Sequence, residues 1–466
     1  MKLSLWLLAV GITLCQAFTP SSDWENKKYD KTLDLTKSYV KEKHIIEAVN
    51  VGSEPQDAYF FGIPSDLRPK VALLISTLQS QSQPTILETE PVVENSEDGF
   101  LSYYKITLPY PVAPKSSFSL QVTYAYTDSL TPIPQTAELG EKQTLYYQGV
   151  KTPASPYDTT SYRLRVIGLA NAKEVPLSPG EDVSEEYQGR VENESLVYGP
   201  FKSTVFKKFS SIPLALAFEK QAPLPHVYNL KRDYWVSHWS DSLSLEEHYQ
   251  FSNKAVKLAK GFSRVDWMSG RYSMKPNPAI VAIQIPLTPH ISTKDVYYTD
   301  LVGNVSTSAF IKNDLILKPR FPIFGDWNYN FTVGWNHELK DFVREVEDKH
   351  VLAVPLLNGI NDVTYEKVEL SFLLPEGATF LDVQSPVNYD SLDVAPEFSY
   401  FDLASGHTRI TLTFSNLVDE MKNLKVVVIY KYTVLDQFKK VFILAGYFFI
   451  ALLAVFGFTK LDFSLK

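Results

Sequence analysis

Residues 120–126, LQVTYAY, alternate large apolar side chains with smaller or polar ones. Side chains on a β-strand point alternately to the two faces of a sheet, so Leu120, Val122, Tyr124 and Tyr126 would share one face. A helix would mix the two kinds of residue, because its facing neighbours lie three and four positions apart. The segment therefore predicts a strand that buries one face in a core.

The same period of two recurs in later parts of the chain. It is present at Tyr162, Leu164 and Val166, at Val368, Leu370 and Phe372, and at Ile410, Leu412 and Phe414. The 29 prolines and the abundant Tyr, Phe, Thr and Val fit short strands joined by turns. We therefore expect a mainly β fold with few helices.

Helical patterns are few. Residues 253–262, NKAVKLAKGF, have the composition of one short helix. Residues 34–51 and 67–78 show a less regular helical spacing. We expect a helix at the first of these segments and count the other two as candidates.

The 466 residues are enough for two or three domains outside a membrane. A proline-rich break at residues 221–225, QAPLP, is the best internal boundary signal. We therefore expect two β-sandwich-like domains, residues 18–221 and residues 222–435.

An unbroken apolar run of 18 residues lies near the C-terminus, at residues 441–458 (VFILAGYFFIALLAVFGF). As a helix it would extend about 27 Å, close to the hydrocarbon thickness of a membrane. A glycolipid-anchor signal would end on apolar residues, whereas Lys460, Asp462 and Lys466 follow this run. We predict a transmembrane helix at 441–458 and a short cytosolic tail at 459–466.

Residues 1–17 have the features of a secretory signal peptide. Lys2 precedes an apolar stretch, and a small residue, Ala17, stands before a polar start that contains Pro20. We expect cleavage after Ala17. Together with the C-terminal span, this signal predicts a single-pass type I membrane protein whose bulk lies in the lumen of the secretory pathway.

Charge and cysteine usage exclude several classes of function. The chain has 45 basic and 53 acidic residues and no long basic run, so we expect no nucleic-acid partner. The single cysteine, Cys15, lies inside the predicted signal, so the mature chain would have neither disulfides nor a cysteine nucleophile nor a thiolate zinc site. Large packed cores must then hold the domains together.

Three sequons for N-glycosylation are present, at Asn193, Asn304 and Asn330. In a luminal chain each is a candidate glycan site. We favour Asn304 and Asn193 over Asn330, because aromatic residues crowd the third.

We find no motif of an active site: the chain lacks HExxH, GxSxG, a P-loop, GxGxxG and an Asp-x-Asp pair. The densest polar and aromatic segment is residues 235–251, WVSHWSDSLSLEEHYQF. Its possible metal ligands are His238, Asp241, Glu246, Glu247 and His248.

These side chains do not converge on a strand, because Glu247 and Tyr249 would share one face while Glu246 and His248 share the other. The simpler interpretation is a turn at residues 240–242 between two strands, with Trp235 and Trp239 anchored in the core. Glu345 and Glu347 would share a strand face, but nothing marks them as an acid and base pair. We predict no catalytic, cofactor-binding or metal-binding residues and no cofactor.

Three motifs, in order, resemble the hallmarks of the ribophorin I family. They are VSHW with EEHY at residues 236–239 and 246–249, DVYY with GNVSTS at residues 295–298 and 303–308, and PRFPIFGDW at residues 319–327. The family more often has glycine where Asp326 stands, and its cytosolic tail is often longer. The resemblance extends to the signal, the cysteine-poor ectodomain and the C-terminal span, and it is weakest before Gln221.

The resemblance implies the large single-span subunit, the alpha subunit, of the oligosaccharyltransferase complex of the endoplasmic reticulum membrane. That complex transfers a preassembled oligosaccharide from dolichyl diphosphate to Asn in Asn-x-Ser/Thr of nascent chains. In this family the catalytic residues belong to another, multi-span subunit, and the ribophorin subunit supports assembly and acceptor delivery. Expected partners are the other subunits, nascent polypeptides and the translocation channel.

Two other classes of function stay open at this point. A free-standing luminal binding protein or chaperone adaptor would behave as a monomer in mild detergent. A luminal hydrolase on a β scaffold would need converging carboxylates or a metal site, for example at Glu246, Glu247 and His248. For the aromatic side chains around residues 235–239 and 321–327 two interpretations stay open: exposed members contribute to a subunit interface, or the rings are buried within their own domain.

Overall fold

The computed structural model describes residues 20, 22–79, 84–92, 99–176, 187–193, 195–201, 205–272, 277–287, 295–399, 402 and 406–460. The predicted signal peptide, with Cys15 and the cleavage position after Ala17, lies outside the described residues, as does most of the tail predicted at 459–466. The chain divides into two compact units. The first consists of Met1–Thr36, Val40–Ser129 and Tyr146–Phe218, and the second of Lys37–Tyr39, Leu130–Leu145 and Glu219–Lys466.

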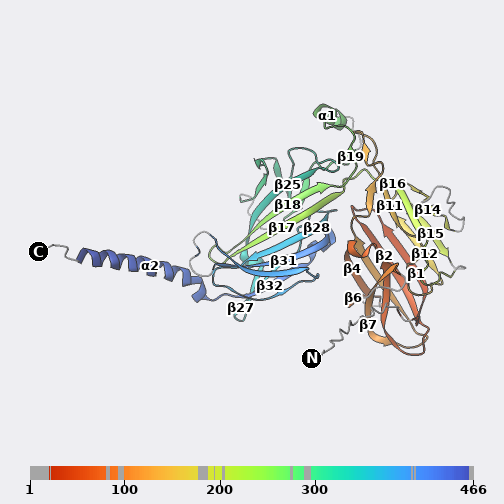
Figure 1. Cartoon of the computed structure of the whole chain (residues 1–466), viewed down its shortest axis with the longest axis horizontal. Coiled ribbons are helices and arrows are strands. Elements are labelled where there is room, and N and C mark those ends of the chain that lie inside the picture. Colours follow the sequence, from red (N-terminus) through yellow and green to blue (C-terminus); the bar gives the residue numbers. More distant parts are fainter. Residues whose placement is uncertain are drawn as a thin grey trace, which may run out of the picture. The chain divides into compact units, whose positions relative to one another are not determined.

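Strands make up most of both units, which confirms the predicted mainly β fold (Figure 1). The described residues include two α-helices, α1 (Arg264–Tyr272) and α2 (Val434–Lys460). Three short 3-10 turns accompany them at Arg68–Lys70, Leu339–Asp341 and Asp419–Asn423. Few helices were expected, and few are found.

The largest sheet of the first unit has eight strands in the order β14–β15–β12–β1–β2–β8–β4–β5. Their bounds are β14 Arg190–Glu192, β15 Ser195–Phe201, β12 Tyr162–Ile167, β1 Trp24–Asp34, β2 Val40–Asn50, β8 Ser117–Tyr126, β4 Val71–Leu78 and β5 Thr85–Leu87. A three-stranded sheet follows the order β3–β7–β6, with β3 Gln56–Pro64, β7 Leu101–Val112 and β6 Thr89–Pro91. A further sheet contains β13 Ala170–Glu174, β16 Pro213–Glu219 and β11 Thr144–Val150.

The segment LQVTYAY lies in β8, between β2 and β4 of the eight-stranded sheet, as its alternation predicts. Leu120, Val122, Tyr124 and Tyr126 are all buried. On the same inner face, the His44 ring of β2 lies 5.3 Å from the ring of Tyr124. It also lies 5.1 Å from the ring of Phe61 on β3, so the two sheets pack face to face in a β-sandwich-like arrangement.

A buried carboxylate, Glu42, lies inside this sandwich. It pairs with the Lys31 ammonium at 2.9 Å and accepts hydrogen bonds from the hydroxyls of Tyr124 at 2.5 Å and Tyr126 at 2.9 Å. Burial alone would raise the pKa of Glu42, but Lys31 and then His44 lower it well below its usual range. The Glu42 carboxylate is therefore charged, and the Lys31 ammonium beside it compensates that buried charge.

The second unit is built on another eight-stranded sheet, in the order β22–β21–β25–β18–β17–β28–β31–β30 (Figure 1). The bounds are β22 Gly303–Asn304, β21 Tyr297–Asp300, β25 Asn328–Glu338, β18 Ser242–Asn253, β17 Pro225–Ser237, β28 Thr364–Leu373, β31 His407–Val418 and β30 Ser391–Glu397. A four-stranded sheet contains β26 Val343–Val346, β27 Lys349–Pro355, β32 Lys425–Lys431 and β29 Thr379–Gln384, and a three-stranded sheet contains β20 Ile283–Pro286, β24 Asp314–Leu317 and β23 Ser308–Ile311. Short strands β9 Leu130–Pro132, β10 Thr136–Ala137 and β19 Lys257–Leu258 complete the list, with β10 pairing β19.

A buried arginine links the two larger sheets of this unit. Arg232 Nε on β17 donates to Glu247 Oε1 on β18 at 2.7 Å, and both side chains are buried. The Nη1 atom of Arg232 donates to the carbonyl oxygens of Pro355 and Leu356, each at 2.7 Å, at the end of β27. The Arg232 guanidinium therefore compensates the buried charge of Glu247 and satisfies two backbone carbonyl oxygens at the end of a strand in the facing sheet.

The second unit also includes a short segment from early in the chain. Lys37 Nζ lies 2.7 Å from Asp419 Oδ2, and the Tyr39 hydroxyl donates to Asp419 Oδ1 at 2.6 Å. The backbone N–H of Ser38 donates to Asp362 Oδ1 at 2.5 Å. Lys37 and Asp419 are 382 positions apart, so this unit is discontinuous in sequence.

The helix predicted at residues 253–262 is wrong. β18 continues to Asn253, β19 covers Lys257–Leu258, and α1 begins only at Arg264. The buried Asn253 side chain explains the extended backbone, because its Oδ1 accepts from the N–H groups of Leu224 and Ala255 while its Nδ2 donates to two carbonyl oxygens. These bonds tie Asn253 to segments elsewhere in the chain, and β19 pairs with β10, so long-range contacts outweigh the local helical preference.

The other two helix candidates are also strands for most of their length. Residues 34–51 contain β2, in which buried and less buried positions alternate, and residues 67–78 contain one 3-10 turn followed by β4. In both cases pairing with neighbouring strands of the eight-stranded sheet outweighs local helical preference.

Helix α2 contains the apolar run predicted to span a membrane. It has 27 residues, it is strongly apolar, and none of its residues is buried, so its length and composition suit a membrane crossing. The helix begins at Val434, seven residues before the predicted span. Asp436 Oδ2 accepts from the backbone N–H and the hydroxyl of Thr433, and the Thr433 hydroxyl accepts from the N–H of Asp436, which is the reciprocal pattern of a capping box.

Replacing Lys31 by Met should destabilise the first unit by about 3–5 kcal/mol, because the Glu42 carboxylate would stay buried without its cation. Urea unfolding followed by intrinsic fluorescence measures the change. The matched control is Lys28→Met on the same strand, since Lys28 pairs with Asp30 in a solvent-exposed ion pair worth about 0–1 kcal/mol. Equal losses in the two variants would contradict the role given to Lys31.

The second unit should lose stability as the pH falls below about 6.5, because His337 is held neutral when folded. The Trp335 indole N–H donates to His337 Nε2 at 2.8 Å. Burial, with a smaller contribution from the Arg232 charge, lowers the pKa of His337 to about 4. The unfolded chain therefore binds a proton that the folded chain excludes, and the free energy of unfolding should fall by up to about 3 kcal/mol between pH 6.5 and pH 4.

Replacing His337 by Asn should flatten this part of the pH profile, measured by urea unfolding at a series of pH values. His248→Asn serves as the control, because that ring is half-exposed on the outer face of the same sheet. An unchanged pH slope in the His337 variant would contradict the prediction.

Candidate functional site

The first motif, VSHW with EEHY, forms the hairpin of β17 and β18. The turn covers residues 238–241, overlapping the predicted turn at 240–242, and Asp241 adopts a left-handed φ of 47° there. Glu247 and Tyr249 lie on the buried face, and Glu246 and His248 lie on the outer face, as strand alternation predicts. The segment is therefore a structural hairpin with two chemically different faces.

Four of the five candidate metal ligands of this hairpin have other partners, among them His238, whose Nε2 lies 2.8 Å from the Tyr430 hydroxyl. Glu247 binds Arg232 and accepts from Tyr249 at 2.9 Å and from Asn358 at 2.6 Å. On the outer face, Glu246 pairs with His248 at 2.9 Å and also binds the Tyr297 hydroxyl. Among the described residues, no group of three His, Cys, Asp or Glu side chains is placed to hold a metal ion.

Glu345 and Glu347 do not form a pair of catalytic carboxylates. Glu345 lies in β26, and Glu347 lies in the turn after it with a φ of 58°. Both side chains are exposed. The structure therefore places them at the surface, and not together on one strand face.

Trp235 and Trp239 are not core anchors, contrary to expectation. Trp235 is 38% exposed, because its neighbours Tyr234 and Val236 occupy the inward positions of β17. Trp239 is 59% exposed in the hairpin turn, where its ring lies 5.5 Å from the ring of Phe438 on α2. Composition alone identified the aromatic cluster, but the alternation of side chains along β17 places Trp235 at the surface and the hairpin turn places Trp239 there.

An ion pair connects the second and third motifs. Arg320 Nε donates to Asp300 Oδ2 at 2.6 Å, and Arg320 Nη2 donates to the carbonyl oxygen of Asn304 at 3.0 Å. The Tyr329 hydroxyl donates to the same Asp300 oxygen at 3.3 Å. The motifs at residues 295–308 and 319–327 therefore form one continuous structural element at the edge of the eight-stranded sheet.

The third motif turns sharply at Gly325 and Asp326. A side chain at Gly325 would meet the carbonyl oxygens of Ala255 and Val256 at 2.2 Å, so only glycine fits. Asp326 has a φ of 66°, in the left-handed region that favours glycine, and its N–H donates to the carbonyl oxygen of Asn253 at 2.7 Å. This conformation accounts for the glycine that related sequences are expected to have where Asp326 stands.

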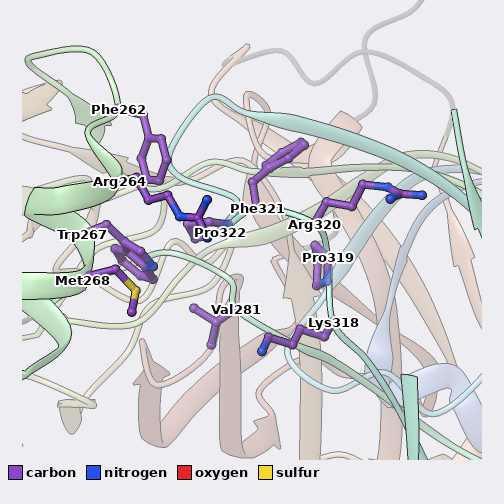
Figure 2. Close-up of a pocket in the computed structure, with 10 residues that line it drawn as sticks. All are labelled: Phe262, Arg264, Trp267, Met268, Val281, Lys318, Pro319, Arg320, Phe321 and Pro322. Carbon is purple, nitrogen blue, oxygen red and sulfur yellow. The ribbon is translucent and has the colours of Figure 1, made fainter. Parts of the chain in front are cut away.

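The third motif forms one wall of an open pocket of about 440 Å³, shown in Figure 2. Phe262, Arg264, Trp267 and Met268, in or just before α1, face Phe321 and Pro322 of the PRFP loop (Figure 2). Val281, Lys318, Pro319 and Arg320 complete the lining. We call these ten residues the PRFP pocket.

The PRFP pocket has the chemistry of a binding surface. Aromatic rings, prolines and a methionine provide apolar contact, while Arg264 and Lys318 add positive charge, and none of the ten lining residues is acidic. This apolar and cationic lining is chemically suited to an apolar or acidic peptide segment. Sequence patterns found the PRFP loop but missed α1, whose contribution arises only through tertiary packing.

The three sequons lie at exposed asparagines. Asn193 follows β14, Asn304 ends the edge strand β22, and Asn330 lies within β25 with its side chain on the outer face. Their modification stays a prediction.

These features define a class: a β-rich protein of two units, with one helix long and apolar enough to cross a membrane and a pocket of binding type. The family model of ribophorin I matches residues 24–459, and the chain belongs to the ribophorin I family. The resemblance predicted from the three motifs is thereby confirmed.

Curated relatives extend over nearly the whole chain. Subunit 1A of the dolichyl-diphosphooligosaccharide–protein glycosyltransferase of Arabidopsis thaliana is 28% identical, covering 100% of this chain and 74% of its own. Subunit 1 of the same glycosyltransferase from Schizosaccharomyces pombe is 28% identical, covering 93% of each chain. Subunit 1 from Caenorhabditis elegans is 24% identical, covering 98% of this chain and 76% of its own.

Among solved structures, leukotriene A4 hydrolase from Saccharomyces cerevisiae aligns with a TM-score of 0.26 and 12% identity, covering 42% of this chain and 29% of that one. A likeness this low supports no conclusion about fold or function.

Replacing Gly325 by Ala should destabilise the second unit by about 2–4 kcal/mol, because the new Cβ would collide with two backbone carbonyl oxygens. Thermal unfolding measures the loss. Gly270→Ala on α1 is the matched control, since its Cβ would meet nothing closer than 3.7 Å, and Asp326→Gly should change stability by less than about 1 kcal/mol. A Gly325 variant as stable as the Gly270 variant would contradict the assigned geometry.

Proposed function

We propose that this protein is a non-catalytic subunit of an oligosaccharyltransferase complex in the endoplasmic reticulum membrane. The complex would transfer a preassembled oligosaccharide from dolichyl diphosphate to Asn of Asn-x-Ser/Thr in nascent chains. The observation that carries the proposal is the family match over residues 24–459, together with near full-length relatives named as subunit 1 of that glycosyltransferase.

The proposed role is support and positioning, because the polar side chains of the motifs already serve structural ends. Glu247 is bound to Arg232, and Asp300 is bound to Arg320. A platform that holds an acceptor chain near a partner's active site raises its effective concentration without touching the reacting bond. Catalysis is assigned to the multi-span subunit, and no cofactor to this chain.

The proposed topology is single-pass type I. Residues 1–17 are removed as a signal, residues 18–221 and 222–435 form luminal β-rich domains, residues 441–458 span the membrane and residues 459–466 face the cytosol. The exposed Asn193, Asn304 and Asn330 are then available to the luminal glycosylation machinery.

We assign acceptor or subunit contact to the PRFP pocket. Phe321 is exposed beside Pro322, and its ring lies 5.7 Å from Trp327, so an apolar surface with neighbouring positive charge is open to a partner. Aromatic and arginine side chains are favoured at such interfaces. The candidate partners are the other transferase subunits, nascent polypeptides and the translocation channel.

The decisive experiment is purification of the tagged full chain in a mild detergent, followed by an assay for transfer of a dolichol-linked oligosaccharide to an acceptor peptide. We expect transfer activity and larger subunits to co-purify. A monomeric protein without activity, together with normal glycosylation in cells depleted of it, would overturn the proposal in favour of a free-standing binding protein.

Replacing Phe321 by Ser should reduce acceptor transfer or the yield of co-purified subunits several-fold, while the fold persists. The control is Ile311→Ser, since Ile311 is an apolar side chain on β23 outside the pocket and is more exposed than Phe321, at 59% against 38%. Equal recovery of complex and activity from the two variants would remove the PRFP pocket from the proposed role.

A further inference from the structure

The start of helix α2 is attached to the second unit by charged side chains. Lys440, the last residue before the apolar run, pairs with Glu376 at 3.1 Å and with Asp402 at 3.0 Å. Burial alone would raise the pKa of Asp402, but the Ser399 backbone N–H and then Lys440 lower it, so the carboxylate is charged. Gly377 approaches Asp436 from the same side, since a Cβ placed on it would lie 3.5 Å from the Asp436 Cβ. The helix therefore leaves the folded unit from a defined position.

The tip of the β17–β18 hairpin touches this helix start. Trp239 lies in the turn, and its ring packs edge-on against Phe438 at 5.5 Å. Phe438 packs in turn towards Phe442, which is inside the apolar run, at 6.5 Å. An aromatic series thus leads from the hairpin tip into the segment expected to cross the membrane.

Helix geometry places Trp239 at the level of the lipid headgroups. The 27 residues of α2 span about 40 Å, whereas the hydrocarbon core needs about 30 Å, so part of the helix extends into the interface. Phe438 stands three residues, or about 4.5 Å along the axis, before Val441. A ring that touches Phe438 lies within about 10 Å of the hydrocarbon boundary, where tryptophan is enriched in membrane proteins.

The surroundings of Trp239 fit a lipid interface better than a protein core. The ring is 59% exposed, and among the described residues its indole N–H has no hydrogen-bond partner. Leu435, on the first turn of α2, is also highly exposed, and Lys439 stands beside Lys440 at the boundary. Apolar rings with a polar N–H and flanking lysines are the residues that anchor proteins in the headgroup layer.

We propose that the β17–β18 hairpin tip is a second membrane contact, in which Trp239 inserts into the lipid headgroup layer beside α2. The partner is the lipid surface itself. This inference rests on the proposed membrane anchoring by α2. Together, the Lys440 ion pairs and the inserted Trp239 fix the angle at which the second unit stands on the bilayer.

The test uses the full chain with Cys15→Ser and one new cysteine carrying an environment-sensitive fluorophore, reconstituted alone into phosphatidylcholine vesicles. Ser240→Cys labels the hairpin turn and leaves Trp239 in place. Leu301→Cys is the matched control, because Leu301 is apolar and 87% exposed but lies far from the hairpin tip. Its neighbour Asp300 is opposite Phe331 in the sheet, and Phe331 is opposite Tyr249. Tyr249, in β18, is nine residues along the chain from Ser240. At about 3.3 Å per residue the two labels are about 30 Å apart.

We expect lipids that carry a quencher near the headgroup to quench the label at position 240 several-fold more than the label at position 301. Replacing Trp239 by Ser in the Ser240→Cys chain should reduce that quenching, whereas Trp235→Ser should not. Thermal unfolding of each labelled chain confirms that it is folded. Equal quenching at the two positions, in chains that float with the vesicles, would overturn the inference.

Two further outcomes separate this inference from the proposals on which it rests. Failure of the chain to float with vesicles would overturn membrane anchoring and the hairpin contact together. Protection of position 240 only when other subunits are present would show a protein occupant and overturn the lipid contact, while leaving the subunit assignment intact. Co-purification of transferase activity is measured separately in the same unlabelled variants.

Discussion

Each unit buries a carboxylate with a cation beside it: Glu42 with Lys31 in the first unit, and Glu247 with Arg232 in the second. Arg232 and Glu247 are direct partners in the register of β17 and β18. A slip of β18 by one residue against β17 would turn Glu247 to the other face, leave Arg232 buried without its partner and expose the apolar set of β18 that now faces inward. A buried charge without a partner is strongly destabilising, so these pairs fix strand register in a chain that has a single cysteine, Cys15, and therefore no internal disulfide.

The β fold was predictable because a strand buried on one face has an apolar residue at every second position, and a single sequence is enough to show this pattern. The segment in β8 and the later segments in β28 and β31 all follow this rule. Residues 253–262 could not be predicted in this way, because their extended backbone depends on hydrogen bonds between the Asn253 side chain and Leu224, Pro278 and Ile323. Such long-range hydrogen bonds leave no local pattern, so composition suggested a helix where the chain is extended.

The candidate site was predictable in its residues but not in its arrangement. The motifs at residues 295–308 and 319–327 stood out in the sequence, yet only the structure shows that Arg320 and Asp300 join them. Helix α1, which provides Trp267 to the PRFP pocket, carries no motif. The two tryptophans of the hairpin show the opposite error: aromatic residues suggested a core, but the phase of β17 and the position of the turn put Trp235 and Trp239 outside.

The discontinuous second unit has a consequence for biosynthesis. Lys37 and Tyr39 find their partner, Asp419, only after some 380 further residues have been made. Because a chain is synthesised from its N-terminus, most of the first sandwich can form early, but this short segment must stay accessible until the last strands have been made. The second unit therefore cannot be completed until translation is almost over. During this interval its incomplete sheets are the part of the chain that chaperones would most need to protect from aggregation.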